Sequence, residues 1–365
     1  MQILPFGFEE HGMSLHYFVN DVLMAVFFGI AAKEVRESLL PGGSLSSPRK
    51  AAMPLMATVG GMAGPALLFL GGTVLMGRPD LVRGWAIPCA TDIAFSYLVA
   101  RLIFGKGHPA IAFLLMLAIA DDAGGLIILA IAYPQKPIEV QWFFLTGIAL
   151  MLCLMMRRFK VHSFWWYLLG PGVLSWISFQ WAGIHAALGI VPVVCLGMPH
   201  AHTDLGIFAR EEGRKDTLNE FDHWWKNPTE IILGLFALTN AGVVLSSVGQ
   251  GTAFVLIGLV IGKPLGITVF TLIGEKVFGL KLAEGMTYRH IISLGMVAGI
   301  GFTVALFVST AAFPEPGPVQ DAVKMGALGS FFAAVIAFIG ARMLGVKPLH
   351  SCEAKRRTTG RPPIS

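Results

Sequence analysis

Charge is scarce in this sequence. Asp, Glu, Lys and Arg make up 13% of its 365 residues, whereas soluble domains carry about a quarter. Hydrophobic residues account for 55%, and the mean hydropathy is +0.69. This composition excludes an ordinary soluble domain and predicts an integral membrane protein. The net charge of +5 comes mostly from loops and the C-terminal tail, which indicates membrane topology and contact with lipid head groups rather than nucleic-acid binding.

Cysteine is also rare, and its spacing excludes a CxxC motif or a zinc-binding pattern. Cys89, Cys153 and Cys195 lie in apolar segments, and Cys352 lies in the tail. We therefore expect the cysteines to be packing residues. The first fourteen residues contain two acidic residues and no basic stretch, so they do not predict a signal peptide.

Apolar runs of about 20 residues, long enough to cross a bilayer, recur along the whole chain. They predict an all-α polytopic membrane protein with about eleven transmembrane helices. A polar insert from His200 to Asn227 is expected to form a loop or a short surface helix. The predicted spans are 16–37, 50–76, 85–104, 109–133, 141–156, 163–181, 183–198, 229–248, 252–273, 288–312 and 322–345.

Basic residues gather in alternate loops, which sets the expected orientation. The side of the membrane with few basic residues contains Arg78, Arg83, Lys136 and Lys324. Because Lys and Arg favour the cytoplasmic side, we expect a cytoplasmic C-terminus. The N-terminus is then periplasmic, if residue 1 is the natural start.

Two halves of the sequence resemble each other weakly. GMAGPALLF at 61–69 resembles GKPLGITVF at 262–270, and ATDIAFSYLV resembles GFTVALFVST further along each half. A third span completes a triplet of helices in each half: 109–133 in the first half and 322–345 in the second. An odd number of crossings separates equivalent spans, so the triplets run in opposite senses. This predicts inverted-topology three-helix repeats with two broken, crossing helices.

The repeats also predict how the helices are grouped within one membrane domain, residues 1–365. The core helices are expected at about 50–133 and 252–345. The interface or linker helices are expected at about 16–37 and 141–248.

The segments around Asp92 and its repeat partner carry residues that interrupt helices. Pro88 removes a backbone hydrogen bond, and Thr91 and Asp92 can cap the freed backbone. Gly299 and Gly301 tolerate non-helical backbone. Since two crossing broken helices bring like partial charges together, we expect Asp92 to neutralise the two N-terminal ends. A purely local cap is the alternative.

Four ionisable residues stand inside apolar runs: Asp92, Asp121, Asp122 and Lys263. Each costs about 2.5–3.5 kcal/mol at the centre of a membrane helix, or roughly 10 kcal/mol together. We therefore expect them to face each other and a wet pathway for ions or protons. Lys263 is expected to neutralise the C-terminal helix ends, and whether it also carries a proton stays open.

Asp121 and Asp122 point in directions about 100° apart around a helix. One carboxylate is therefore expected to pair with Lys263, and the other to bind the permeating ion. Carboxylates suit hard cations, while burial and the neighbouring negative charge favour the protonated form. A cation and protons would thus compete for one site. The alternative is a structural Asp–Lys clamp, which needs one Asp.

Further ionisable residues are expected near the cytoplasmic surface. Glu34, Asp222 and His223, together with Arg36 and Glu37, are candidates for an ion funnel or a pH-responsive cluster. Ordinary surface ion pairs are the alternative.

Other histidines are expected to have less specific roles. His185 lies inside a span, where packing or a bond between helices is expected. A solvated loop is expected for His200, His202 and His290.

Several stretches, in order from about residue 17 to 345, resemble the bacterial NhaA-type Na+/H+ antiporter family. They are FVNDVLMAVFFGIAAKEVRE, GWAIPCATDIAF, LAIADDAGG, GIHAALGIVP, ALTNAGVVL, IGKPLGI and AGIGFTVALF. The resemblance implies electrogenic exchange of cytoplasmic Na+ (or Li+) for external protons in the bacterial inner membrane, with no cofactor. It implies Asp122 as the main cation ligand with Thr91 nearby, Asp121 paired with Lys263, and Asp92 as charge compensation.

The resemblance also implies a homodimer and activation at alkaline pH. Family members have twelve spans and a β-hairpin between the first two; we expect this chain to lack the first span and the hairpin, which weakens the dimer expectation. The family's Glu-His pair is replaced here by Asp222-His223, so pH regulation transfers less securely than transport.

Two other functions would also need charged residues inside the membrane. A Na+-coupled symporter for an organic anion would need polar groups for the anion, and beyond Lys263 none stands out. An intramembrane aspartyl protease places its two carboxylates on different helices. Here they are adjacent, and no GxGD sequence occurs. The chain is therefore not expected to be an enzyme.

Overall fold

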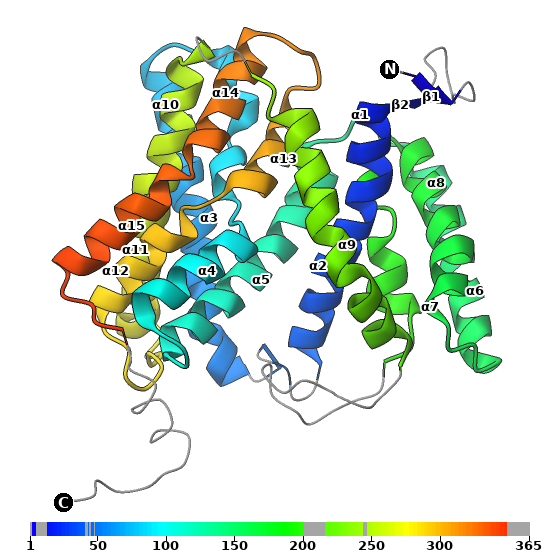
Figure 1. Ribbon diagram of the computed structural model, residues 1–365, viewed down its shortest axis with the longest axis horizontal. Helices are drawn as coiled ribbons and strands as arrows, with labels where there is room; N and C mark the ends of the chain where they lie inside the picture. Colours follow the sequence, from blue (N-terminus) through cyan, green and yellow to red (C-terminus); the bar gives the residue numbers. More distant parts are fainter. Residues whose placement is uncertain are drawn as a thin grey trace, which may run out of the picture. The chain divides into compact units, whose positions relative to one another are not determined.

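The computed structural model describes most of the chain (Figure 1). The described residues are 2–4, 13–40, 43, 45–46, 48–200, 216–243 and 247–348. They are helical apart from connecting loops and two short strands. Within these described residues, six helices are long and apolar enough to cross a membrane, or up to eight if each of two bent pairs counts as one span. The prediction of an all-helical, polytopic membrane protein is confirmed at this level.

The two strands correct one expectation. β1 (Gln2–Leu4) pairs antiparallel with β2 (Met13–Ser14), with Gln2 opposite Ser14 and Leu4 opposite Met13. The expectation that the chain lacks an N-terminal hairpin was therefore wrong. Strands of two and three residues are shorter than the four to eight residues over which alternation can be recognised.

The chain divides into two compact units, each described by itself. Unit 1 comprises Met1–Ser46 and Ala123–Gly242, and unit 2 comprises Ser47–Asp122 and Val243–Ser365. The border lies inside one helix, α5 (Pro109–Ala132), directly after Asp122.

Unit 1 contains one long span at its start, Leu15–Leu39, built from α1 (Leu15–Tyr17), a π-helical turn (Phe18–Leu23) and α2 (Met24–Leu39). Its other helices are α6 (Phe143–Arg158), α7 (Phe164–Tyr167), α8 (Val173–Ala182) and α9 (Thr217–Asn240). Two short turns, Ala186–Leu188 and Val193–Gly197, lie between α8 and α9.

The helix α9 differs from its prediction at both ends. It begins at Thr217, inside the segment expected to be a loop or short surface helix, because the Asp216 side chain caps its start by accepting a 2.8 Å bond from Asn219 N. It ends at Asn240, eight residues before the predicted end of the span at 248. The predicted span 163–181 is helical without a break from Phe164 to Ala182, through α7, a π-helical turn and α8, but it is not among the helices both long and apolar enough to cross a membrane. The predicted span 183–198 contains a shorter apolar helical segment, Ala186–Gly197.

Unit 2 contains the bent helices. The chain from Pro79 to Cys89 meets α4 (Ile93–Phe104) at 54°, and α12 (Tyr288–Ala298) meets α13 (Phe302–Ala312) at 52°. The remaining helices are α3 (Pro48–Leu75), α10 (Gln250–Ile257), α11 (Lys263–Lys276), α14 (Pro318–Gly329) and α15 (Phe332–Met343). α11 packs along α3, and α12 packs against α11, α15 and α4.

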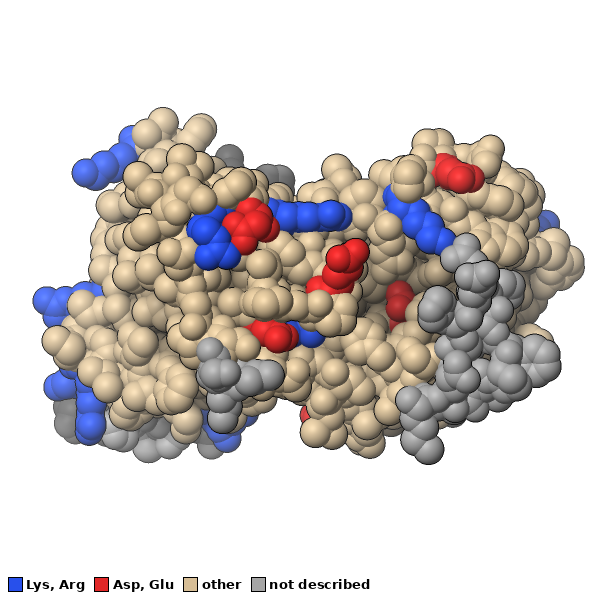
Figure 2. Space-filling model, turned by 90° about the horizontal axis from the view of Figure 1, so that it is seen from above, with Lys and Arg blue, Asp and Glu red and all other residues tan. Residues whose placement is uncertain are grey.

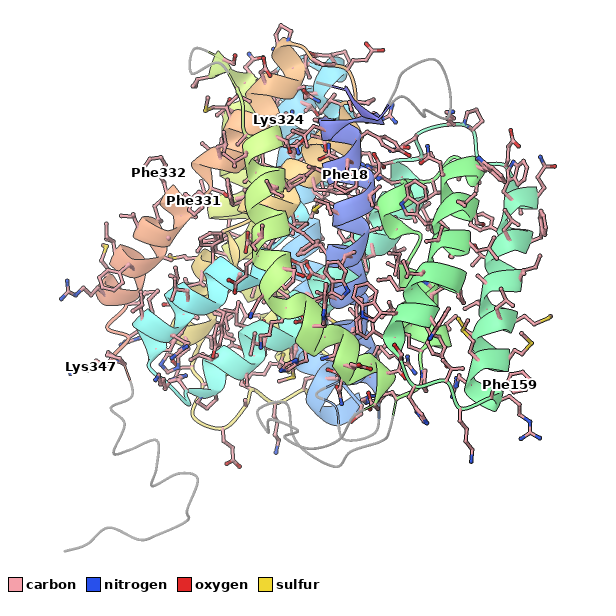
Figure 3. The ribbon with its side chains drawn as sticks, turned by 45° about the vertical axis from the view of Figure 1, so that its right-hand side comes forward. Phe18, Phe159, Lys324, Phe331, Phe332 and Lys347 are labelled. Atoms are coloured by element: carbon pink, nitrogen blue, oxygen red, sulfur yellow. The ribbon has the colours of Figure 1, made fainter. Side chains whose placement is uncertain are left out.

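Apolar side chains also cover much of the outside of the helices, as expected for contact with lipid. Phe332 at the start of α15 is 72% exposed and Phe159 after α6 is 73% exposed (Figure 3). Lys324 is a charged residue that is nevertheless buried, in α14. The face seen in Figure 2 is mostly uncharged, with scattered charged groups.

Glycine allows α3 and α11 to touch backbone to backbone. A Cβ atom on Gly266 would lie 2.0 Å from the carbonyl oxygen of Gly60, and one on Gly64 would lie 2.3 Å from that of Gly262. Small residues permit such close helix packing in membranes. This contact fixes the helix that carries Lys263.

Replacing Gly266 with alanine is expected to lower the stability of the folded protein by at least about 2 kcal/mol, because α11 must move away from α3. Thermal unfolding of the purified protein in detergent measures the effect. Gly71→Ala is the matched control, since its Cβ would meet nothing within 4 Å. Equal unfolding temperatures for the two variants would contradict the prediction.

Candidate functional site

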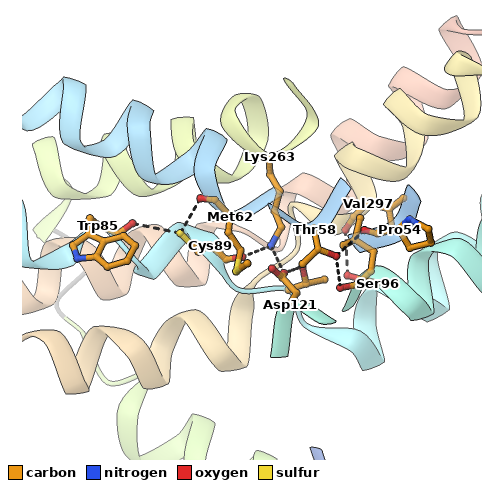
Figure 4. Close-up of polar contacts among 11 residues, drawn as sticks. Pro54, Thr58, Met62, Trp85, Cys89, Ser96, Asp121, Lys263 and Val297 are labelled. Carbon is orange, nitrogen blue, oxygen red and sulfur yellow. Dashed lines mark hydrogen bonds and ion pairs between the residues drawn. The ribbon is translucent and has the colours of Figure 1, made fainter. Parts of the chain in front are cut away.

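A buried ion pair joins the middle of α5 to the start of α11. Lys263 Nζ lies 2.8 Å from Asp121 Oδ2 and also donates a 2.5 Å bond to the carbonyl oxygen of Cys89 (Figure 4). Thr91 Oγ1 donates to the same carboxylate oxygen at 2.6 Å. Lys263 is fully buried and Asp121 is 3% exposed. Since a lone buried charge is strongly destabilising, each of these two groups depends on the other.

The second carboxylate oxygen of Asp121 has different surroundings from the first. Among the described residues, the buried Oδ1 atom has no hydrogen-bond partner. Asp122 follows on the same helix and is half-buried, with its side chain leaving the helix about 100° away. A carboxylate oxygen without a donor suits a proton or a hard cation.

Asp92 caps two helices at once. Its Oδ1 accepts a 3.2 Å bond from Phe95 N, in the first turn of α4. Its Oδ2 accepts bonds from Thr303 N at 3.2 Å and from Thr303 Oγ1 at 2.6 Å, in the first turn of α13. The carboxylate thus lies at two positive helix ends, where a negative charge is stabilised.

The two helix breaks lie against each other. Asp92 N donates to Ile300 O at 2.8 Å, and a Cβ on Gly301 would lie 2.9 Å from Ala90 O. Gly299 ends α12 and Gly301 precedes α13. Pro88 lies in a short 3-10 turn, Ile87–Cys89, just before the first break.

The carbonyl ends of the broken helices are satisfied by two different side chains. Lys263 donates to Cys89, the last residue before the first break. At the end of α12, Ser96 Oγ donates to Val297 O at 3.2 Å. The sequence assigned both ends to Lys263, so Ser96 was missed as a partner.

In unit 1, the acidic candidates surround a cation that the sequence analysis overlooked. Lys33 is buried and pairs with Glu37 at 2.7 Å and Asp222 at 3.2 Å. Glu34 interacts electrostatically with the same three groups, while His223 is exposed. Lys33 could have been found by the criterion applied to Lys263, a charge next to an apolar run.

Arg36, another member of the predicted cluster, binds backbone carbonyl groups. Its guanidinium donates to Val194 O and Met198 O, both at 2.8 Å, and so satisfies carbonyl groups at the end of the turn Val193–Gly197. Its role is structural in this geometry.

A second buried polar group was missed inside the first span. Asp21 Oδ1 lies 3.3 Å from His185 Nδ1, and the Asp21 carbonyl oxygen accepts a 2.9 Å bond from Trp176 Nε1. Asp21 interrupts the apolar run FVNDVLMAVFF, which is the same signal that singled out Asp92.

Two histidines expected on solvated loops are not fully exposed. His200 Nδ1 pairs with Asp216 at 3.0 Å, and its side chain is 8% exposed. His290 is half-buried in the first turn of α12. His202 lies outside the described residues.

In the described part of the chain, no three His, Cys, Asp or Glu side chains are grouped to hold a metal ion.

Comparison with known proteins assigns the chain to a family. The model of the family described as Na+/H+ antiporter 1 matches residues 2–340. A Na+/H+ antiporter NhaA from Jannaschia sp. (strain CCS1) is 50% identical over 93% of this chain and 86% of its own length. NhaA proteins of Desulfitobacterium hafniense (46%, covering 94% and 88%) and Geobacter sulfurreducens (45%, covering 92% and 88%) are similar. The chain therefore belongs to the Na+/H+ antiporter 1 family.

Proposed function

We propose that this protein is a secondary transporter that exports cytoplasmic Na+ (or Li+) in exchange for external protons at Asp121 and Asp122. Lys263 balances the charge of Asp121, so Asp122 supplies the net negative charge that attracts a cation. Thr91, which donates to Asp121, supplies a further oxygen beside the site. The observation that carries the proposal is the buried Asp121–Lys263 pair, with Asp122 next to it, at the helix breaks.

Competition between cation and protons accounts for exchange. When Na+ occupies the carboxylates, protons are displaced, and when protons bind, Na+ leaves. Two carboxyl groups can carry two protons against one Na+, so each cycle moves net charge and responds to the membrane potential. A negative interior then favours Na+ export.

The helix breaks supply the conformational part of the proposal. Asp92 stabilises the two N-terminal helix ends at the break, and Lys263 stabilises one carbonyl end. The ion site can therefore become exposed to either side of the membrane while these helix ends keep their hydrogen bonds. We further propose that the triplets around the two bent helices are inverted repeats within about eleven spans. Alternating access then exposes the site to one side of the membrane at a time.

The remaining expectations belong to the same proposal. The excess of basic loops on one side supports a cytoplasmic C-terminus, for a protein in the bacterial inner membrane. In this proposal the Lys33–Asp222 ion pair, with Glu34 and His223, belongs to a pH-sensitive region on the same side. The β1–β2 pair removes one of the two reasons for doubting a homodimer, the expected lack of a hairpin.

Everted membrane vesicles test the proposal. With a proton gradient already formed, addition of Na+ is expected to collapse it for the wild type, and Asp122→Asn is expected to abolish the response. The physical reason is that asparagine neither binds Na+ by charge nor exchanges a proton.

The matched control is Asp80→Asn, which removes an exposed carboxylate that pairs with Arg78 and is expected to leave exchange intact. A wild type that responds at no pH between about 6.5 and 9 would contradict the proposal. A response that requires an added organic anion would favour a Na+-coupled symporter instead.

A further inference from the structure

Two histidines of unit 2 lie in contact where α5 and α12 begin. The rings of His108 and His290 have centroids 4.7 Å apart at an interplanar angle of 70°. The fully buried Phe104 ring packs against both, at 5.4 and 6.2 Å. His108 is 6% exposed. The pair lies outside the ion site and outside the Lys33 cluster.

Both rings accept hydrogen bonds from the backbone. His108 directly precedes α5, and its Nδ1 accepts a 3.0 Å bond from Ala110 N. His290 is the third residue of α12, and its Nδ1 accepts a 3.1 Å bond from Thr287 N, which completes a capping box. An amide N–H can only donate, so each Nδ1 must carry a lone pair. Both rings are therefore neutral in this geometry, with their proton on Nε2.

Protonation would break this arrangement in three ways. Each Nδ1 would become a donor facing another donor, which removes the cap. Each positive ring would lie at the positive end of a helix dipole. The two positive charges would also be in contact with each other.

The elements around the pair carry charges of both signs. The cations on α4, α11, α12, α15 and their connections are Arg101, Lys106, Lys263, Lys276, Lys281, Arg289, Arg342 and Lys347, of which Lys263 pairs with Asp121. The acids are Glu275, which accepts a hydrogen bond from the Tyr288 hydroxyl, and the exposed Glu284. Cations outnumber acids on these elements.

We propose that His108 and His290 are positioning residues that hold the starts of α5 and α12 together when both rings are neutral and release them when a proton binds. α5 carries Asp121 and Asp122, and α12 leads into the break that Asp92 caps. His108 precedes Asp121 by about 20 Å along the helix, so it acts by positioning α5 rather than by direct charge. This inference rests on the proposed exchange of Na+ for protons and adds a second proton-sensitive element to it.

A variant that keeps both caps but cannot titrate tests the inference. His108→Asn retains an N-cap acceptor, and His290→Gln retains a capping-box acceptor. His162→Gln, at an exposed histidine of unit 1, is the matched control. If the double variant does not fold, His290→Gln alone is measured in its place.

The first measurement is the thermal unfolding temperature of the purified protein between about pH 5.5 and 8.5, a window around the ordinary titration of histidine. Because the folded state holds both rings neutral, the unfolded chain binds more protons at acid pH, so stability rises with pH. The wild type is expected to lose stability relative to the double variant below about pH 6.5, and to match it above about pH 7.5. A difference that does not change with pH would overturn the inference.

The second measurement is Na+-dependent proton exchange in vesicles over the same range. The pH of half-maximal exchange is expected to move about one unit to the acid side in the double variant, with an unchanged maximum. An unchanged profile would overturn the coupling of this pair to transport. If the wild type shows no exchange at any pH, the proposed function fails, while the unfolding measurement still decides whether the pair responds to protons.

Discussion

Replacing Lys263 with methionine is expected to destabilise the folded protein by about 3–5 kcal/mol, because the Asp121 charge stays buried without its cation. Lys263 is fully buried and lies 2.8 Å from Asp121 Oδ2, so water cannot replace the ammonium group without reopening the core. Methionine is similar in length, so the lost charge rather than a cavity dominates the effect. Thermal unfolding in detergent at pH 8 measures it.

A second substitution separates charge from packing in the same experiment. Lys263→Met combined with Asp121→Asn removes both charges and is expected to recover most of the lost stability, since a neutral pair of similar volume carries little desolvation cost. Lys276→Met, at an exposed lysine on the same helix, is the control and is expected to change little. A double variant no more stable than Lys263→Met would show that the ion pair is not the source of the effect.

Asp92→Ala is expected to cost about 2–4 kcal/mol, because one carboxylate caps both α4 and α13. A single helix cap is worth about 1 kcal/mol. Thermal unfolding of the purified protein measures the loss, and vesicle assays are expected to show reduced exchange, since the broken helices lose their common anchor.

A graded series tests this dual cap. Asp92→Asn keeps one acceptor oxygen and is expected to lose roughly half as much stability as Asp92→Ala. Thr303→Val removes one of the three donors to Asp92 and is expected to lose about 1 kcal/mol. Equal losses for Asp92→Ala and Thr303→Val would show that the carboxylate does not join the two helices.

These predictions depend on contacts that differ in how far the sequence could identify them. The charges themselves were visible, since an ionisable residue in an apolar run is costly wherever its partner lies. The partner of Asp92, Thr303, was not identified, although the repeat placed GFTVALF opposite ATDIAF. Repeats align segments, but they do not specify which hydroxyl reaches which carboxylate.

Predictions from local sequence patterns were also wrong for elements that are short or that begin at a capping residue. The β1–β2 pair was missed because two- and three-residue strands carry no periodic signal. The start of α9 was missed because its first turns are polar and depend on the Asp216 cap. Lys33 and Asp21 were missed although each stands beside apolar residues, as Lys263 and Asp92 do.

The sequence by itself determined the membrane class, the six long spans and the positions of the two bent helices, because apolar length and helix-breaking residues act within one segment. The tertiary structure alone decided which oxygen of Asp121 holds Lys263, that Asp92 caps two helices, and that His108 meets His290. Those contacts join residues up to 211 positions apart. They depend on how each helix is rotated and how closely glycine lets neighbours approach, which no single segment specifies.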